Sequence, residues 1–317
     1  MDSNNYSRIL RNWRLEFERA RGDLPLAESP GSVAAREVLV DTTGAVWVLE
    51  EVDEESYSRK VAMAENMEMA AAPGAIPLPA YRRNTLGQFV TSCQGSPRML
   101  RPYVEGIELD PRVWLSETWR AKALADYLIN LKRSTNTSPA ASDSNTFSIV
   151  EFVKGKTEAL GRFRPEIERG LHPVFQALDE SLFPALAEGP VGFCHGDFRP
   201  LNVIWGADSI LGVVSWDFCG AKPETYDAAL LVGCVGFDDP DALTGEFTTA
   251  FVHALRDAAV YAPESWNLFF DLAIALRYYR LAEWTRQNDE NARDMEILYM
   301  NLLTKQKGYI LKHWGLA

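Results

Sequence analysis

Residues 191–205, VGFCHGDFRPLNVIW, are the starting point of the fold prediction. Their middle part, residues 195–202, is polar and predicts a loop. Apolar, strand-like segments follow at residues 202–205 and 210–214, on either side of a Gly206-Ala207-Asp208 turn. Polar side chains next to buried strands need a chemical reason, because burying them without partners costs free energy. The stretch therefore predicts a functional loop at one end of a short β segment.

The sequence before this loop predicts a small β-rich lobe. Strand-like segments at residues 37–41, 45–52 and 99–104 accompany one helix, at residues 55–72. We assign residues 1–103 to this N-terminal lobe.

The sequence after the third strand is mostly helical. Apolar residues recur at i, i+3, i+4 and i+7, as from Leu272 to Tyr279, which is typical of one buried helix face. We predict a larger helical C-terminal lobe over residues 104–317, with the loop at 195–202 and a strand at 210–217 inside it. The fold class predicted is α+β, with two lobes.

The composition limits the partners that we expect. The 317 residues include 44 acidic and 32 basic side chains, a net charge of −12. Nucleic-acid binding depends largely on Lys and Arg, so we expect no nucleic-acid partner. No apolar run approaches the roughly 18 residues that cross a bilayer, and the N-terminus lacks the apolar block of a signal peptide. We predict a cytoplasmic protein with no membrane partner, acting as a monomer or homodimer.

Cysteine and histidine do not suggest a transition-metal centre. The four cysteines are far apart in sequence and form no CxxC pair, and the four histidines show no metal-ligand spacing on one helix face. We expect isolated thiols.

The loop HGDFRPLN, His195–Asn202, resembles the catalytic loop of the aminoglycoside phosphotransferase and choline kinase families, and more distantly the H-R-D-x-x-x-x-N loop of protein kinases. The likeness extends over most of the chain, through a β hairpin and helix, a hinge-like PYVEG segment, and SWDFCGAKPETYDAALL after the loop. The resemblance implies a bilobal protein-kinase-like fold and transfer of the γ-phosphate of ATP to a hydroxyl of a small metabolite.

The same resemblance implies roles for the loop residues. Asp197 would be the general base that takes the proton of the attacking hydroxyl. Arg199 would lie near the transferring phosphoryl group, and Asn202 would offer its amide oxygen to Mg²⁺. His195 is expected to hold the loop by hydrogen bonds. Asp227 is expected to cap a helix or hold the same loop.

The nucleotide site is predicted from weaker signals. The hinge-like segment, residues 101–104, would offer backbone groups of Arg101 and Tyr103 to the base of ATP. Gly31 and Ser32 provide the turn that could cover the phosphates.

Two departures from the family pattern leave the activity open. Ser215 stands where the family has its main magnesium-binding aspartate, and Asp217, two residues further, is a second candidate ligand. No lysine lies near Glu50, where the family has one that binds the α- and β-phosphates. Lys60, on the predicted helix, and Arg36, beside the first strand, are substitutes that the sequence does not distinguish from solvated surface charges.

The alternative to an enzyme is therefore a pseudokinase, a nucleotide-binding module with little or no turnover. The acceptor also stays open between an amino alcohol, a sugar and an amino acid, and the acidic composition favours a cationic one. Arg277, Arg280 and Glu283 on the late helix either line an acceptor site or form a solvated face.

Overall fold

The structure, a computed structural model, describes most of the chain: residues 3–26, 35–72, 74–93, 96–110, 113–135, 148–187 and 189–316. Gly31 and Ser32 lie outside the described residues. The chain forms two compact units. The first unit comprises Met1–Leu109 and Pro200–Cys219, and the second comprises Asp110–Arg199 and Gly220–Ala317.

The first unit is built on a five-stranded antiparallel sheet with strand order β1-β2-β3-β5-β4. The strands are β1 (Phe17–Ala20), β2 (Arg36–Asp41), β3 (Val46–Glu51), β4 (Thr91–Cys93) and β5 (Ser96–Pro102). A tight turn joins β2 to β3, where Asp41 accepts a hydrogen bond from the backbone N–H of Thr43 at 2.8 Å and Gly44 adopts a φ of +84°. Glycine adopts this left-handed conformation without steric cost.

The register of the sheet divides its side chains between two faces. Arg36 pairs with Glu50 across β2 and β3, and Val48 pairs with Arg101 across β3 and β5. Because side chains alternate along a strand, Val48 and Glu50 share a face. Arg36, Glu50 and Arg101 therefore lie on one face of the sheet.

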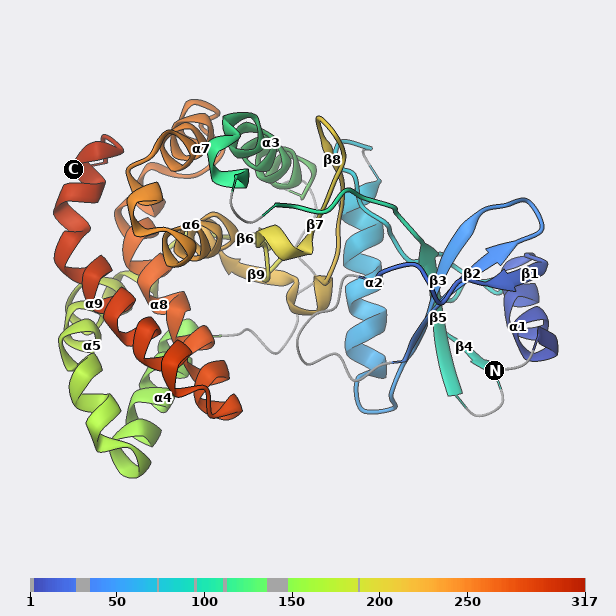
Figure 1. The fold of residues 1–317 in the computed structure, drawn as a ribbon, viewed down its shortest axis with the longest axis horizontal. Helices are drawn as coiled ribbons and strands as arrows, with labels where there is room; N and C mark the ends of the chain where they lie inside the picture. The colour runs from blue at the N-terminus through green and yellow to red at the C-terminus, as the bar shows by residue number, and fades with distance from the viewer. Residues whose placement is uncertain are drawn as a thin grey trace. The chain divides into compact units, whose positions relative to one another are not determined.

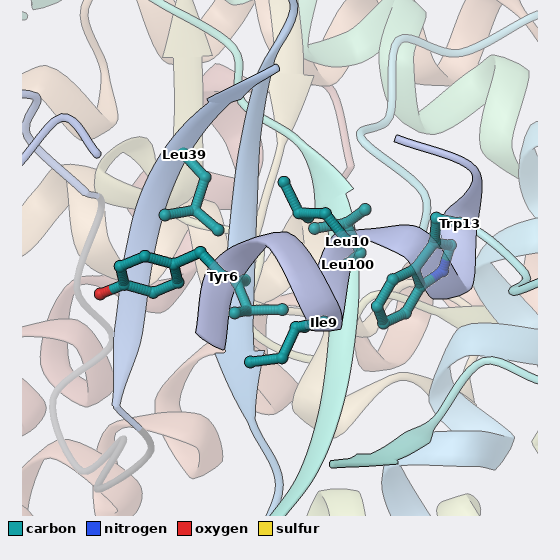
Figure 2. Close-up of a cluster of buried hydrophobic side chains, with 7 residues drawn as sticks. Tyr6, Ile9, Leu10, Trp13, Leu39 and Leu100 are labelled. Atoms are coloured by element: carbon teal, nitrogen blue, oxygen red, sulfur yellow. The ribbon is translucent and has the colours of Figure 1, made fainter. Parts of the chain in front are cut away.

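The opposite face of the sheet is apolar. It packs against α1 (Ser3–Leu10) and the 3₁₀ turn η1 (Arg11–Trp13), as Figure 2 shows. The buried cluster consists of Tyr6, Ile9, Leu10, Trp13, Leu39, Leu49 and Leu100. Burying one leucine side chain contributes about 2 kcal/mol, so this cluster anchors the N-terminal segment to the sheet.

Helix α2 (Tyr57–Ala71) accompanies the charged face (Figure 1). Its turn of entry is fixed by Asp53, whose carboxylate accepts a hydrogen bond from the backbone N–H of Ser56 at 2.7 Å. The helix buries Met63 and Met67 together with a charged residue, Lys60. The sequence prediction of this helix is confirmed.

The first unit also contains the hairpin of β7 (Val203–Trp205) and β8 (Ile210–Val213). The sequence prediction had placed this hairpin with the helical lobe, but the compact units place it with the sheet. The reason is local packing beyond β5. The N–H of Ile107 donates to the carbonyl of Trp205 at 2.8 Å, and a Cβ added at Gly106 would lie 2.6 Å from Ile204.

The second unit is mainly helical, which confirms the predicted α+β class. Its helices are α3 (Thr118–Thr135), α4 (Ile149–Phe163), α5 (Pro165–Leu186), α6 (Tyr226–Asp238), α7 (Glu246–Asp257), α8 (Pro263–Gln287) and α9 (Glu290–His313). Strands β6 (Val191–Cys194) and β9 (Gly220–Pro223) pair antiparallel within it. Leu272, Ala275 and Leu276 of α8 are buried as expected, whereas Tyr279 is 43% exposed.

Within the described residues, no helix combines the length and the apolar content that a membrane span requires.

Candidate active site

The loop that follows β6 in the second unit is anchored by Asp227. The carboxylate of Asp227 accepts hydrogen bonds from the backbone N–H groups of His195, at 2.6 Å, and Gly196, at 2.8 Å. Gly196 has a φ of +86°, a left-handed conformation in which a larger residue would be strained. Asp227 is only 3% exposed. The prediction that it holds the loop is confirmed.

His195 fixes the next part of the loop. Its side chain is fully buried, and its Nδ1 accepts a hydrogen bond from the backbone N–H of Asp197 at 3.1 Å. The ring also contacts Phe198 edge-on, with 6.2 Å between ring centroids. The expected structural role of His195 is therefore confirmed, and its effect is to set the direction of the Asp197 backbone.

Asp197 and Arg199 form an ion pair at the end of this loop. The Nε of Arg199 lies 3.1 Å from Oδ1 of Asp197 and 3.2 Å from Oδ2. The Asp197 side chain is 15% exposed, so a ligand can reach it, while Arg199 is largely buried. The guanidinium group holds the carboxylate in a fixed direction.

Arginines of α8 make the surroundings of Arg199 basic. Arg277 is not on a solvated face but forms a buried two-bond ion pair with Glu296, at 2.6 and 2.7 Å. The pKa of Arg280 is lowered by burial and by repulsion from Arg199. Among the described residues no carboxylate pairs with Arg280, whose guanidinium instead lies 4.6 Å from the centre of the Trp284 ring.

Glu283, the third candidate residue of α8 for the acceptor site, pairs with a neighbour on its own helix. Glu283 pairs with Arg286 one turn away on α8, at 2.7 Å, and this contact lowers the pKa of Glu283. The Glu283 side chain is only 17% exposed, so both possibilities left open by the sequence remain predictions for this residue.

In the first unit, a buried ion cluster joins α2 to β3. The Nζ of Lys60 lies 2.6 Å from Oε1 of Glu50 and 2.6 Å from Oδ1 of Asp217. Glu50 also receives the hydroxyl hydrogen bond of Tyr81 at 2.8 Å and pairs with the Nε of Arg36 at 3.2 Å. Lys60 is 6% exposed and Glu50 is 1% exposed. The cluster is thus largely shielded from water.

The pKa of Glu50 shows that opposite charge outweighs burial in this cluster. Burial alone would raise that pKa, but the charges of Lys60 and Arg36 and the hydrogen bonds of Lys60 and Tyr81 hold it below its ordinary value. Glu50 therefore stabilises the fold in its ionised form. That contribution is present above the ordinary glutamate pKa and is lost as the pH falls through the lowered one.

Asn202, Ser215 and Asp217, the predicted magnesium ligands, all belong to the first unit. Asn202 is 2% exposed, and its backbone carbonyl accepts a hydrogen bond from the N–H of Val214 at 2.9 Å, which brings it beside Ser215. The strand predicted to run to residue 217 ends at Val213. Ser215 has a left-handed backbone, with a φ of 68°, and a 3₁₀ turn, η4 (Trp216–Phe218), follows. This bend directs Asp217 to Lys60.

The one carboxylate among these candidate magnesium ligands is already paired with a lysine. Magnesium is usually bound by one or two carboxylates together with waters and phosphates. The set here offers one carboxylate, Asp217, which is already paired with the ammonium group of Lys60. Among the described residues no three acidic, histidine or cysteine side chains form a metal-binding group. The magnesium assignment stays a prediction that this arrangement does not favour.

A pocket opens beside the ion cluster, within the first unit, with about 340 Å³ of empty space that includes its opening to solvent. It is lined by Arg36, Glu50, Met63, Met67, Pro79, Tyr81, Arg101, Val214, Ser215, Trp216 and Asp217. The pocket thus combines charged groups with the apolar side chains of α2.

The hinge-like residues take different places from those predicted. Arg101 contributes its side chain to the pocket, whereas the sequence prediction used its backbone. The backbone N–H of Tyr103 donates to the carbonyl of Val46 at 2.9 Å, so sheet pairing already uses this group. The binding of a nucleotide base by these backbone groups stays a prediction.

Comparison with known proteins assigns the chain to a family. The model of the phosphotransferase enzyme family matches residues 27–269, which is more than half of the sequence. The chain belongs to this family. No curated protein sequence matches it.

Several solved structures share the fold of this family member. An aminoglycoside phosphotransferase from Alicyclobacillus acidocaldarius has a TM-score of 0.66 at 11% identity, covering 96% of this chain and 94% of that one. An amicoumacin kinase in complex with AMP-PNP, Ca²⁺ and Ami also has a TM-score of 0.66, at 12% identity, covering 95% of this chain and 92% of that one. A microcompartment-associated aminopropanol kinase reaches a TM-score of 0.62 at 16% identity, covering 100% and 99%.

Against the kinase pattern, the Glu50–Lys60 pair has inverted polarity. In protein kinases the lysine is on strand β3 and the glutamate is on the following helix. In this chain β3 supplies Glu50 and α2 supplies Lys60. The sequence analysis did not predict this arrangement. Two signals could have indicated it: Lys60 is the only lysine in the first hundred residues, and Glu50 is a charged residue directly after the apolar segment VWVL.

Replacing Lys60 tests the ion cluster. Lys60→Met leaves the carboxylates of Glu50 and Asp217 without their shared cation, and removing one partner of a buried ion pair typically costs several kcal/mol. We expect the free energy of unfolding to fall by about 3 kcal/mol, measured by urea denaturation. Lys305→Met, at an exposed lysine, is the control and should change it by less than about 0.5 kcal/mol. Equal stabilities of the two variants would contradict the cluster.

The pH dependence of stability tests Asp227. Burial raises the pKa of Asp227 to about 6, even though two backbone N–H groups oppose the shift. A raised carboxyl pKa gives stability that is present below the unfolded pKa and lost as the pH rises through the folded one. Relative to Asp227→Asn, the wild-type free energy of unfolding should therefore fall by roughly 2 kcal/mol between about pH 4.5 and pH 7.5.

The control for that comparison is Asp208→Asn, at an exposed turn aspartate. Its difference from the wild type should not vary with pH over the same range. A constant difference between the wild type and Asp227→Asn would contradict the raised pKa.

Proposed function

We propose that this phosphotransferase moves the γ-phosphate of ATP to a hydroxyl group of a small molecule, with Asp197 as the general base. The observation that carries the proposal is the loop built around Asp197. Asp227 anchors its start, His195 directs its backbone, and Arg199 orients its carboxylate. A loop of this construction holds one carboxylate, partly open to ligands, in a fixed direction.

The proposed step is an in-line displacement. The acceptor oxygen forms a bond to the γ-phosphorus, the bond from that phosphorus to the bridging oxygen of ADP breaks, and the hydroxyl proton passes to Asp197. Arg199, at 3.1 Å from Asp197, keeps the carboxylate in one orientation during the transfer. The two backbone hydrogen bonds that Asp227 accepts hold the loop still during this transfer.

The neighbouring structures support ATP and a small acceptor. One was determined with AMP-PNP, an ATP analogue, and a second is an aminopropanol kinase, whose acceptor is a small amino alcohol. Magnesium is the divalent ion proposed from the family resemblance, but no step is assigned to it, because the candidate ligands do not form a suitable site.

The charges around Asp197 are of both signs, so they leave the charge of the acceptor open. Arg280 has no carboxylate partner among the described residues, and its pKa is lowered in part by Arg199. The carboxyl groups of Asp238 and Glu283 also interact with the charge of Arg280, so these surroundings are not purely basic. The net charge of a chain does not determine the potential at one site, so the cationic acceptor expected from the acidic composition stays a prediction.

A second function, nucleotide binding with little turnover, is favoured by one observation. Asp217 is paired with Lys60, and Ser215 brings no charge to the position of the family's metal-binding aspartate. A protein with this arrangement can bind a nucleotide without completing the transfer.

The experiment that separates these functions is a turnover assay on wild type and Asp197→Asn. Each protein is incubated with ATP, magnesium or manganese, and a panel of amino alcohols, sugars and hydroxy acids, and the release of ADP and a phosphorylated product is measured. Asp197→Asn should lower kcat by about 10²- to 10⁴-fold and leave ATP affinity unchanged. Asp208→Asn, at the exposed turn, is the matched control and should retain wild-type turnover.

If wild type and Asp197→Asn give the same background rate with every acceptor while ATP still binds, the enzyme proposal is wrong. The nucleotide-binding function then stands.

A further inference from the structure

We propose that the pocket of the first unit binds a phosphate group through the guanidinium groups of Arg36 and Arg101, and that this binding does not depend on a divalent cation. The inference rests on the proposed function only in naming ATP as the natural source of the phosphate.

The first argument is the isolation of Arg101. This residue is 7% exposed and lines the pocket. Within the described part of the chain no carboxylate pairs with it, and the one hydrogen bond found for its guanidinium is a long one, 3.4 Å from Nη1 to the carbonyl of Pro102. Burying an uncompensated charge is costly. The guanidinium therefore calls for an anion that the described residues do not supply.

The second argument is the balance of charge around the pocket. Arg36, Lys60 and Arg101 are cationic, and Glu50 and Asp217 are their anionic counterparts. Lys60 connects the two carboxylates but is not among the residues that line the pocket. The cations that a ligand meets are therefore the two arginines, and the cluster carries one positive charge in excess.

The third argument is the chemistry of the guanidinium group. Its planar fork of N–H donors matches two oxygens of a phosphate, and arginine retains its charge when buried. Arg36 and Arg101 lie on the same face of the sheet, on two strands separated by β3, so both side chains project on the side of the pocket. A nucleobase, which carries no anionic oxygens, would leave these two positive charges uncompensated.

The fourth argument explains the independence from metal. A divalent ion ordinarily offsets the negative charge of phosphates and is held by carboxylates. In this chain Lys60 already neutralises Asp217, and Ser215 has no charge. The fixed arginines supply the positive charge that a bound metal would otherwise bring to the phosphate.

The test measures binding rather than turnover. Isothermal titration of the wild-type chain with inorganic pyrophosphate and with ATP, each in EDTA and in excess magnesium, should show binding of both ligands in EDTA. Adenosine is the probe without phosphate, and citrate is the carboxylate probe. Arg101→Gln should weaken pyrophosphate binding by about 10- to 100-fold, the loss expected for charge-assisted hydrogen bonds. Arg82→Gln, at an exposed arginine of the same unit, should leave it unchanged.

A thermal-shift experiment keeps the test decisive if a variant binds poorly because it is misfolded. Arg101→Met removes a buried charge that lacks an internal partner, so without ligand it should melt at or above the wild-type temperature. Pyrophosphate should raise the melting temperature of the wild type and leave that of Arg101→Met unchanged. A purely structural role for Arg101 predicts the reverse, a variant that melts lower and still responds to pyrophosphate.

Several results would overturn the inference: no pyrophosphate or ATP binding in EDTA, tighter binding of citrate than of pyrophosphate, or equal affinities of the wild type and Arg101→Gln. These results are distinct from failure of the proposed function. Phosphate binding without any Asp197-dependent turnover refutes the enzyme alone. Asp197-dependent turnover with an ATP affinity that Arg101→Gln does not change refutes the phosphate site alone.

Discussion

The ammonium group of Lys60, held between the carboxylates of Glu50 and Asp217, is the contact on which the rest of the first unit depends. It connects β3 and α2, which follow each other in the sequence, to the 3₁₀ turn after β8, which lies far from both in the sequence. Burying any one of these three charges alone would cost free energy, and their mutual attraction offsets that cost. The position of α2 over the charged face of the sheet is therefore set by charge pairing as well as by the burial of Met63 and Met67.

Because of this contact, the charged residues of the first unit differ from those that the family resemblance implies. The strand position that would carry a phosphate-binding lysine carries an acid, and the helix carries the lysine. Asp217 is occupied by that lysine, which leaves the arginines of β2 and β5 as the cations that line the pocket. The second unit, by contrast, holds Asp197 in a loop that resembles the one of the family, with Asp227 anchoring its start and His195 buried beside it. The chain thus combines a family-like loop around Asp197 with a different arrangement of charges in the pocket of the first unit.

The sequence predicted the loop and the fold class because their signals are local. HGDFRPLN is a contiguous motif, and the alternation of β2 and β3 around a Gly44 turn is legible in a few residues. The predicted partners of Asp227 and His195 also lie within or near this motif. These features follow from short-range pattern and turn chemistry.

The ion cluster could not be predicted in the same way. Glu50 and Asp217 are far apart in sequence, and nothing local indicates that one lysine joins them. The bend at Ser215 was missed because a left-handed backbone is uncommon for serine, so the pattern predicted a strand continuing to residue 217. Arg101 was expected to act through its backbone, since only the sheet register shows which face its side chain occupies.

The most direct test of this account is a crystal structure of the protein with AMP-PNP and magnesium. The account predicts phosphate oxygens within hydrogen-bond distance of the guanidinium groups of Arg36 and Arg101, and Lys60 still paired with both Glu50 and Asp217. A magnesium ion bound by Asn202 and Asp217, with Lys60 released from Asp217 and the phosphates away from both arginines, would contradict it.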